Sequence, residues 1–134
     1  MAVTAFKKLD VYRLAEKLAD AIWRMVSTWD WFAKVSVGKQ IVRAADSIGA
    51  NIAEGVGRGT YQDNRRFVRI ARGSLNETMH WLTRGYARNL VSKEQVCTLR
   101  PLLRELAPRL NAYLKSIGPA ANRAAPDLQR TTIT

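Results

Sequence analysis

Residues 36–56 read SVGKQIVRAADSIGANIAEGV, and this stretch decides the class of fold. Its larger apolar residues follow one another at steps of three and four, which places them on one face of an α-helix. That stripe consists of Ile41, Ala45, Ile48, Ile52 and Val56. Small residues surround it, and a glycine inside a helix, here Gly49, costs about 1 kcal/mol relative to alanine. We therefore expect the backbone of a neighbouring helix to approach Gly49 closely.

Three other segments carry apolar residues at the same spacing, at residues 10–29, 61–89 and 93–117. Four amphipathic helices with short connections predict an all-α fold, most simply an up-down-up-down four-helix bundle over residues 1–118. A chain of 134 residues has the length of one domain and can bury a core without disulfides or metals. Residues 119–134 are small and polar, which predicts a mobile C-terminal tail.

Specific residues mark the ends of these helices. Ser92 and Gln95 fit a capping box at the start of the last one. Inside the same helix, Pro101 and Pro108 each remove one backbone hydrogen bond, so we expect a kink or a break. The glycine-rich run at residues 55–59 predicts a helix end in left-handed backbone conformations. It follows a helix and lacks the ending of a phosphate-binding loop, so it is a weak phosphate signal.

The charge of the chain gives the first indication of function. There are 22 lysine and arginine residues against 11 acidic ones, a net charge of +11 and a pI near 10.5. Such a charge favours a polyanionic partner, nucleic acid or an anionic membrane. Alternatively, the charge only keeps the protein dispersed. No run reaches the roughly 18 apolar residues of a membrane span, and no signal peptide is visible, so we expect a soluble cytoplasmic protein.

The residues that usually carry catalysis are scarce. His80 is the only histidine and Cys97 the only cysteine, and no carboxylate cluster has the Glu-x-x-His spacing of a di-metal bundle. We expect a solvated His80 and a buried or half-buried Cys97, and a single cysteine excludes an internal disulfide. The chain is therefore expected to be no enzyme, with no catalytic residue and no metal or other cofactor.

The 61–89 segment carries the sharpest functional signal, a row of basic residues at steps of three, four or eight. The row consists of Arg65, Arg69, Arg72, His80, Arg84 and Arg88, and we expect it to lie along one helix face. Like charges at this spacing repel, so an anion lying against them would stabilise the face. Arginine suits phosphate because its planar guanidinium can donate two parallel hydrogen bonds. The alternative is a solvated face partly neutralised by Asp63 and Glu77.

Aromatic residues give a weaker signal. Trp29 and Trp81 are expected in or beside the core. Trp31 and Phe32 lie where the helical pattern breaks, at residues 30–35. They could stack on bases, but docking on another subunit is preferred because aromatic residues are enriched at interfaces.

Three acidic residues lie among small or apolar ones, namely Asp46, Glu54 and Glu77. Arg43 has the helical spacing to pair with Asp46, and Arg58 to pair with Glu54. We expect structural ion pairs here rather than catalytic carboxylates.

The middle of the chain closely resembles the signature of four-helix-bundle proteins encoded in intervening sequences of bacterial 23S ribosomal RNA genes. That signature reads approximately Arg-Ala-Ala-x-Ser-Ile-x-x-Asn-Ile-Ala-Glu-Gly-x-Gly-Arg. Here it falls on Arg43, Ala44, Ala45, Ser47, Ile48, Asn51, Ile52, Ala53, Glu54, Gly55, Gly57 and Arg58. Residues 6–12 resemble the family's N-terminal segment, and Phe67 with residues 71–77, ending at Glu77, resembles its third-helix segment.

This resemblance implies a bundle that assembles into a ring, typically a homopentamer, with a basic surface. The family is related to the accessory variability determinant of diversity-generating retroelements, and that branch implies binding to a reverse transcriptase and to RNA. Gly49 stands where the family commonly has proline, and Pro101 and Pro108 are unusual in its last helix. The small residues of the 36–56 segment then have two explanations, packing within one bundle or packing between subunits.

Three functional hypotheses follow. The first is a non-enzymatic homo-oligomer that binds nucleic acid, with RNA favoured, through the basic row. The second is a retroelement scaffold that docks a reverse transcriptase and its nucleic acid. The third, a membrane-surface protein, is disfavoured because the basic residues follow a bundle helix rather than flanking an exposed apolar face.

Overall fold

The computed structural model describes residues 2–119, and every regular element among them is helical. The elements in chain order are η1 (Ala2–Lys8), α1 (Asp10–Val26), α2 (Trp31–Ala33), η2 (Lys34–Gly38), α3 (Lys39–Val56), α4 (Tyr61–Ala87) and α5 (Lys93–Ser116). Apart from Pro119, the predicted C-terminal tail lies outside the described residues.

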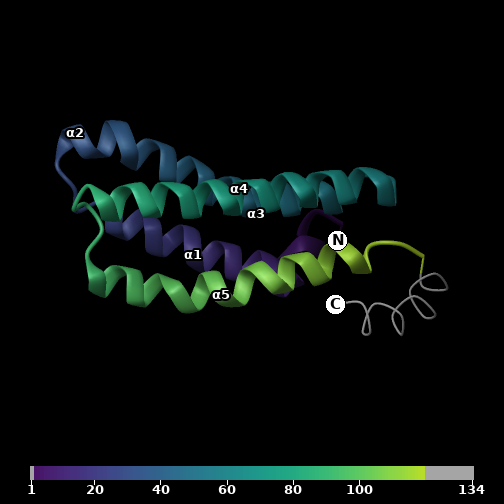
Figure 1. The fold of residues 1–134 in the computed structure, drawn as a ribbon. Coiled ribbons are helices and arrows are strands. Elements are labelled where there is room, and N and C mark those ends of the chain that lie inside the picture. Colours follow the sequence, from purple (N-terminus) through teal and green to yellow (C-terminus); the bar gives the residue numbers. More distant parts are fainter. Residues whose placement is uncertain (1, 120–134) are drawn as a thin grey trace.

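The four long helices α1, α3, α4 and α5 form the predicted bundle, and each runs antiparallel to the next (Figure 1). α3 packs against α1 and α4, and α5 packs against the same two helices from the other side. This is the up-down-up-down arrangement. Each helix therefore has two neighbours and keeps one face toward solvent.

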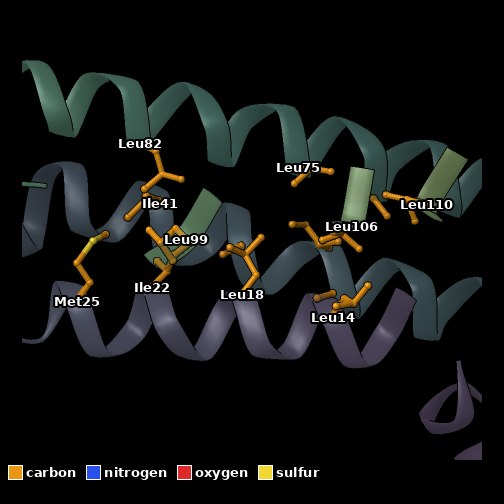
Figure 2. Packing of buried hydrophobic residues seen from close by; sticks show 14 of the residues in the cluster. Leu14, Leu18, Ile22, Met25, Ile41, Leu75, Leu82, Leu99, Leu106 and Leu110 are labelled. Atoms are coloured by element: carbon orange, nitrogen blue, oxygen red, sulfur yellow. The ribbon is translucent and has the colours of Figure 1, made fainter. Parts of the chain in front are cut away.

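The apolar stripes of the helices meet in one core (Figure 2). The largest fully buried side chains are Leu18, Ile22, Ile41, Ile48, Ile52, Val68, Leu75, Thr78, Leu106 and Leu110. In the stripe predicted for residues 36–56, Ile41, Ala45, Ile48 and Ile52 are buried and Val56 is half-buried. On α4 the apolar periodicity of the sequence includes Ile70 and Tyr86, but these two are exposed by 42% and 50%. Ile70 lies two residues after the buried Val68, about 200° round the helix, so both cannot face the core.

The first two helices have other boundaries than those predicted. α1 ends at Val26 rather than at residue 29, because the hydroxyls of Ser27 and Thr28 donate to carbonyls of its last turn at 2.7 Å each. Trp29 is buried nevertheless, in the turn that follows. Asp30 then begins a new helix by accepting a hydrogen bond from the Ala33 amide at 2.9 Å.

The stretch predicted to break the helical pattern is therefore itself helical. η2 is a π-helical turn, which has more residues per turn than an α-helix and so shifts the residues before it out of the apolar stripe. Trp31 and Phe32 are 75% and 74% exposed as a result. A search for a 3.6-residue period cannot follow a helix across such a turn.

Two predictions are wrong, namely a left-handed end to α3 and a break of α5 at its prolines; a kink at the prolines stays a prediction. Gly57 ends α3 with a φ of −79°, so the glycine run does not adopt the expected left-handed conformation. Within residues 2–119, left-handed backbone occurs at Asn89 and Gly118 instead. α5 continues through Pro101 and Pro108, which are both exposed (Figure 1). The carbonyls that these prolines leave free belong to exposed residues, where water can bond to them.

The glycine that the packing needs is Gly55 rather than Gly49. A Cβ at Gly49 would meet the Tyr12 ring at 3.5 Å, an ordinary contact with a side chain and not with a helix backbone. A Cβ at Gly55 would lie 3.2 Å from the backbone oxygen of Asn64 and 3.2 Å from Cβ of Phe67. A side chain at Gly55 would therefore push α3 and α4 apart.

We predict opposite effects for alanine at these two glycines. Gly55→Ala should destabilise the protein by about 1–2 kcal/mol because α4 must shift, even after the gain in helix propensity. Gly49→Ala should be neutral or stabilise it by up to about 1 kcal/mol. Urea unfolding followed by circular dichroism measures both. A Gly55→Ala variant as stable as the wild type would contradict the close approach.

Candidate nucleic-acid interface

The basic row predicted on α4 does not form one straight face. Successive steps of four advance 40° round a helix, so Arg88 lies about 140° from Arg65. Arg69, Arg84 and Arg88 are exposed, and His80 is exposed with its ring against Trp81 at 4.9 Å between centroids. The row therefore winds from the α5 side of α4 to the opposite side.

Two members of the row are tied to α5. The guanidinium of Arg65, which is half-buried, donates to the backbone carbonyl of Ile117 at 2.7 Å. That of Arg72 donates to Oδ1 of Asn111 at 3.3 Å. These bonds hold the C-terminal end of α5 against α4, so Arg65 has a structural role in addition to its charge.

Basic residues of α5 continue the charge on the same side of the bundle. At 100° per residue, Lys93, Arg100, Arg104 and Asn111 lie within about 40° of one another round α5. Since Asn111 contacts Arg72, this side of α5 faces α4. We call Arg65, Arg72, Lys93, Arg100 and Arg104 the basic seam.

The seam borders a groove of about 490 Å³ between α4 and α5. Its walls are mainly apolar, with Met79, Leu82 and Tyr86 from α4 and Val96, Leu99 and Leu103 from α5. Lys93 and Arg100 also line it, and no carboxylate does. The α5 members were missed by the sequence analysis, although their steps of seven and four are the same helical signal that identified the row on α4.

Several acidic residues pair with arginines outside the basic seam. Among the described residues, the ion pairs within 4.0 Å are Arg58 with Glu54 and Asp63, Arg66 with Asp63, and Arg109 with Asp10 and Glu105. Glu77 accepts a hydrogen bond from the indole of Trp81 at 3.3 Å and takes part in none of these ion pairs. Within residues 2–119, no member of the basic seam takes part in such a pair.

The quoted signature residues of α3 mostly hold the bundle together. Ser47 Oγ lies 2.9 Å from Ser74 Oγ of α4, and the Asn51 amide donates to the carbonyl and the hydroxyl of Ser47 at 2.8 and 2.9 Å. The predicted pair of Arg58 with Glu54 is present at 3.4 Å. The small residues thus have an explanation within one bundle, since they allow α3 to approach α4.

The predicted pair of Arg43 with Asp46 is absent from the described part of the chain. Burial raises the pKa of Asp46, and the negative charge of Asp20 raises it further, the opposite of what a nearby guanidinium would do. Asp46, Asp20 and Glu16 line a hollow of about 360 Å³ between α1 and α3. This acidic stretch stands on the side of the bundle away from the basic seam.

The two candidates for chemistry are both at the surface. Cys97 is exposed, which corrects the prediction of a buried or half-buried thiol. It is one of the residues that line the groove between α4 and α5. Residues 2–119 contain no group of three or more His, Cys, Asp or Glu side chains that could hold a metal ion. Over the same residues, no helix is long and apolar enough to cross a bilayer.

Comparison with known proteins places this bundle in a family. The 23S rRNA-intervening sequence protein family matches residues 7–112, most of the part described. The chain belongs to that family. The same residues include the quoted signature and the α4 row, so the resemblance seen in the sequence is confirmed. Comparison with curated proteins gave no match.

A solved structure has the same fold as this member of the 23S rRNA-intervening sequence protein family. It is a protein of unknown function from the S23 ribosomal protein family of Bacteroides thetaiotaomicron VPI-5482, with 25% identity and a TM-score of 0.69. The match covers 79% of this chain and 99% of that one. The four-helix architecture is therefore shared over nearly the whole of the other protein.

We predict that Arg65 and Arg69 differ in their effect on stability. Arg65→Ala should cost about 1–2 kcal/mol because the Ile117 carbonyl loses a charged donor. Arg69→Ala, on the exposed side, should change stability by less than about 0.5 kcal/mol. Thermal unfolding with hydrogen exchange at the end of α5 measures both effects. Equal stability of the two variants would contradict a structural role for Arg65.

We also predict that Asp46 destabilises the protein at neutral pH. Because its native pKa is raised above the unfolded value, the native state binds the proton more tightly, and stability falls as pH rises through that native pKa. Asp46→Asn should therefore raise the urea midpoint at pH 7, and the gain should shrink at acidic pH, where Asp46 is protonated. A gain that stays constant with pH would contradict the assignment.

Proposed function

We propose that this protein binds RNA without catalysis, with the basic seam contacting backbone phosphates. The observation that carries the proposal is the groove between α4 and α5, which Lys93 and Arg100 line and no carboxylate does. Along the same side of the bundle, Arg72 of α4 reaches Asn111 of α5, so the charge continues beyond the groove. Anions bound there would relieve the mutual repulsion of these side chains. Arginine, which supplies four of the five seam residues, is suited to phosphate by its planar, two-pronged donor geometry.

The dimensions of the seam suit a strand rather than a single ion. From Lys93 to Asn111, which contacts Arg72, α5 rises about 27 Å at 1.5 Å per residue. Cations distributed over that length can neutralise several phosphates of one strand. Contacts of this kind fix the position of the nucleic acid but carry little sequence information, so we propose modest sequence specificity.

The family supports RNA as the polyanion. Its description links its members to intervening sequences of 23S rRNA, and we extend that link to this chain as part of the proposal. We further propose that the protein works as a homo-oligomeric ring in the cytoplasm. Trp31 and Phe32, two neighbouring and highly exposed aromatic side chains, support self-association because another subunit could cover them.

The test is a titration of fluorescent structured RNA at several salt concentrations, with the molar mass measured by light scattering in the same samples. Arg100→Gln with Arg104→Gln should weaken binding for all sequences and reduce the slope of log K against log salt by roughly two. Lys7→Gln with Lys17→Gln removes the same charge from exposed positions off the seam, and it should leave the slope nearly unchanged.

Two results would contradict the proposal. An equal loss of RNA affinity in both double variants would mean that net charge alone governs binding. An oligomer of defined mass that binds no RNA at low salt would make the seam a docking surface for protein, as expected of a scaffold for a reverse transcriptase.

A further inference from the structure

A second hollow, away from the basic seam, lies between α1 and the helical segment that leads into α3. Its volume is about 400 Å³, within the range of about 300–1,000 Å³ that is usual for ligand clefts. Val26 and Gly38 lie at its apolar base, where the two segments approach closely. A Cβ at Gly38 would come within 2.8 Å of Val26 Cγ1. Glycine at this position therefore leaves room for the Val26 side chain beside the hollow.

One wall of the hollow is an aromatic ring that the core does not use. Trp23 lines it and is 62% exposed. A tryptophan this exposed leaves a large apolar surface in water, and its flat face is available to another planar group. Neither the fold nor the basic seam accounts for Trp23.

Three cations surround the same hollow. Lys34, Lys39 and Arg43 all line it and are all exposed, and no carboxylate is among its lining residues. None of the three takes part in an ion pair within residues 2–119. Arg43 also belongs to the quoted signature, but unlike Ser47 it contributes no hydrogen bond to the packing of α3 on α4 among these residues. The hollow thus combines a planar apolar wall with unpaired positive charge.

The charge next to the hollow limits what can occupy it. Asp20 and Asp46 lie three residues from Trp23 and Arg43 respectively, one helical turn further along the same two helices, and both line the acidic hollow. A long phosphate backbone or a broad anionic surface would meet these carboxylates. A ligand with one flat apolar group and one or two negative charges would not.

We infer that this hollow binds one unpaired nucleotide, with the base against Trp23 and the flanking phosphates near Lys34, Lys39 and Arg43. The inference rests on the proposed RNA binding and adds a preference for single-stranded or looped RNA over duplex. Base stacking on aromatic side chains is tolerant of sequence because every base has a flat face. The basic seam would hold the backbone on one side of the bundle, and the hollow would take a separate unpaired segment on the other.

The experiment compares a short single-stranded RNA of a few nucleotides with a blunt RNA duplex, each titrated into full-length protein. Trp23→Ala should weaken binding of the single strand by about five-fold to a hundred-fold, the range for lost base–aromatic stacking. It should leave the affinity for the duplex unchanged. Trp23→Phe should retain most of the affinity. Tyr61→Ala removes an exposed aromatic ring that lines neither the hollow nor the groove, and it should have no effect.

A residue-specific readout separates this inference from the proposed function. The indole NMR signal of Trp23, assigned from the Trp23→Phe variant, should shift when the single strand is added, also in the Arg100→Gln and Arg104→Gln background. If the wild type binds both RNAs but Trp23→Ala binds them as tightly as Tyr61→Ala does, the inference is wrong and the proposed function stands. The seam variants could still bind both RNAs while Trp23→Ala binds both more weakly to the same extent. The hollow would then be a general RNA site, and the inferred preference for single strands would be wrong. Binding of Trp23 to anionic lipid vesicles, with RNA unaffected, would identify a membrane contact instead.

Discussion

The close packing of α3 on α4 is the constraint on which the rest of the bundle depends. Gly55 brings the two backbones together where α4 begins, with Asn64 oxygen and Phe67 Cβ each 3.2 Å from the place of a side chain. Further along, the hydroxyls of Ser47 and Ser74 meet at 2.9 Å. Protein interiors are packed as densely as crystals, so a pair of helices fixed at such short range sets the positions left for the others. α1 and α5 must then cover the remaining two sides of one core.

The consequence for function lies on the α4–α5 side. At one end of α5, Arg65 and Arg72 reach across to its last turns and hold them by polar contacts. Toward the other end, the two helices leave the groove of about 490 Å³ between them. Long cationic side chains at Lys93 and Arg100 can border that groove because their charged ends stay in water while their stems cover apolar surface. The groove exists because α4 and α5 do not pack tightly at this end, and it therefore leaves room for these two cations at its border.

The apolar periodicity was sufficient to predict the class of fold, because it depends on local spacing alone. The capping box at Ser92 is equally local, and it is present with bonds of 3.1 and 2.8 Å. Features that depend on how the helices pack against one another were not predicted. The π-helical turn changes the spacing of the apolar residues before α3, so the start of the second long helix could not be located from periodicity. The role of Gly55 could not be predicted without knowing that α4 faces it. The α4 row was found, but its partners on α5 belong together only once the helices are packed.

The positions of the charges say more about function than the net charge does. A charge of +11 spread evenly would keep the chain dispersed and need no partner. The acids are not spread evenly, however. Several of them pair with arginines such as Arg58 and Arg109, and others gather beside Asp46 between α1 and α3. Among residues 2–119, the cations of the basic seam and those around Trp23 take part in none of these ion pairs. Dispersal alone would not require that separation, whereas binding to an anion is strengthened by it.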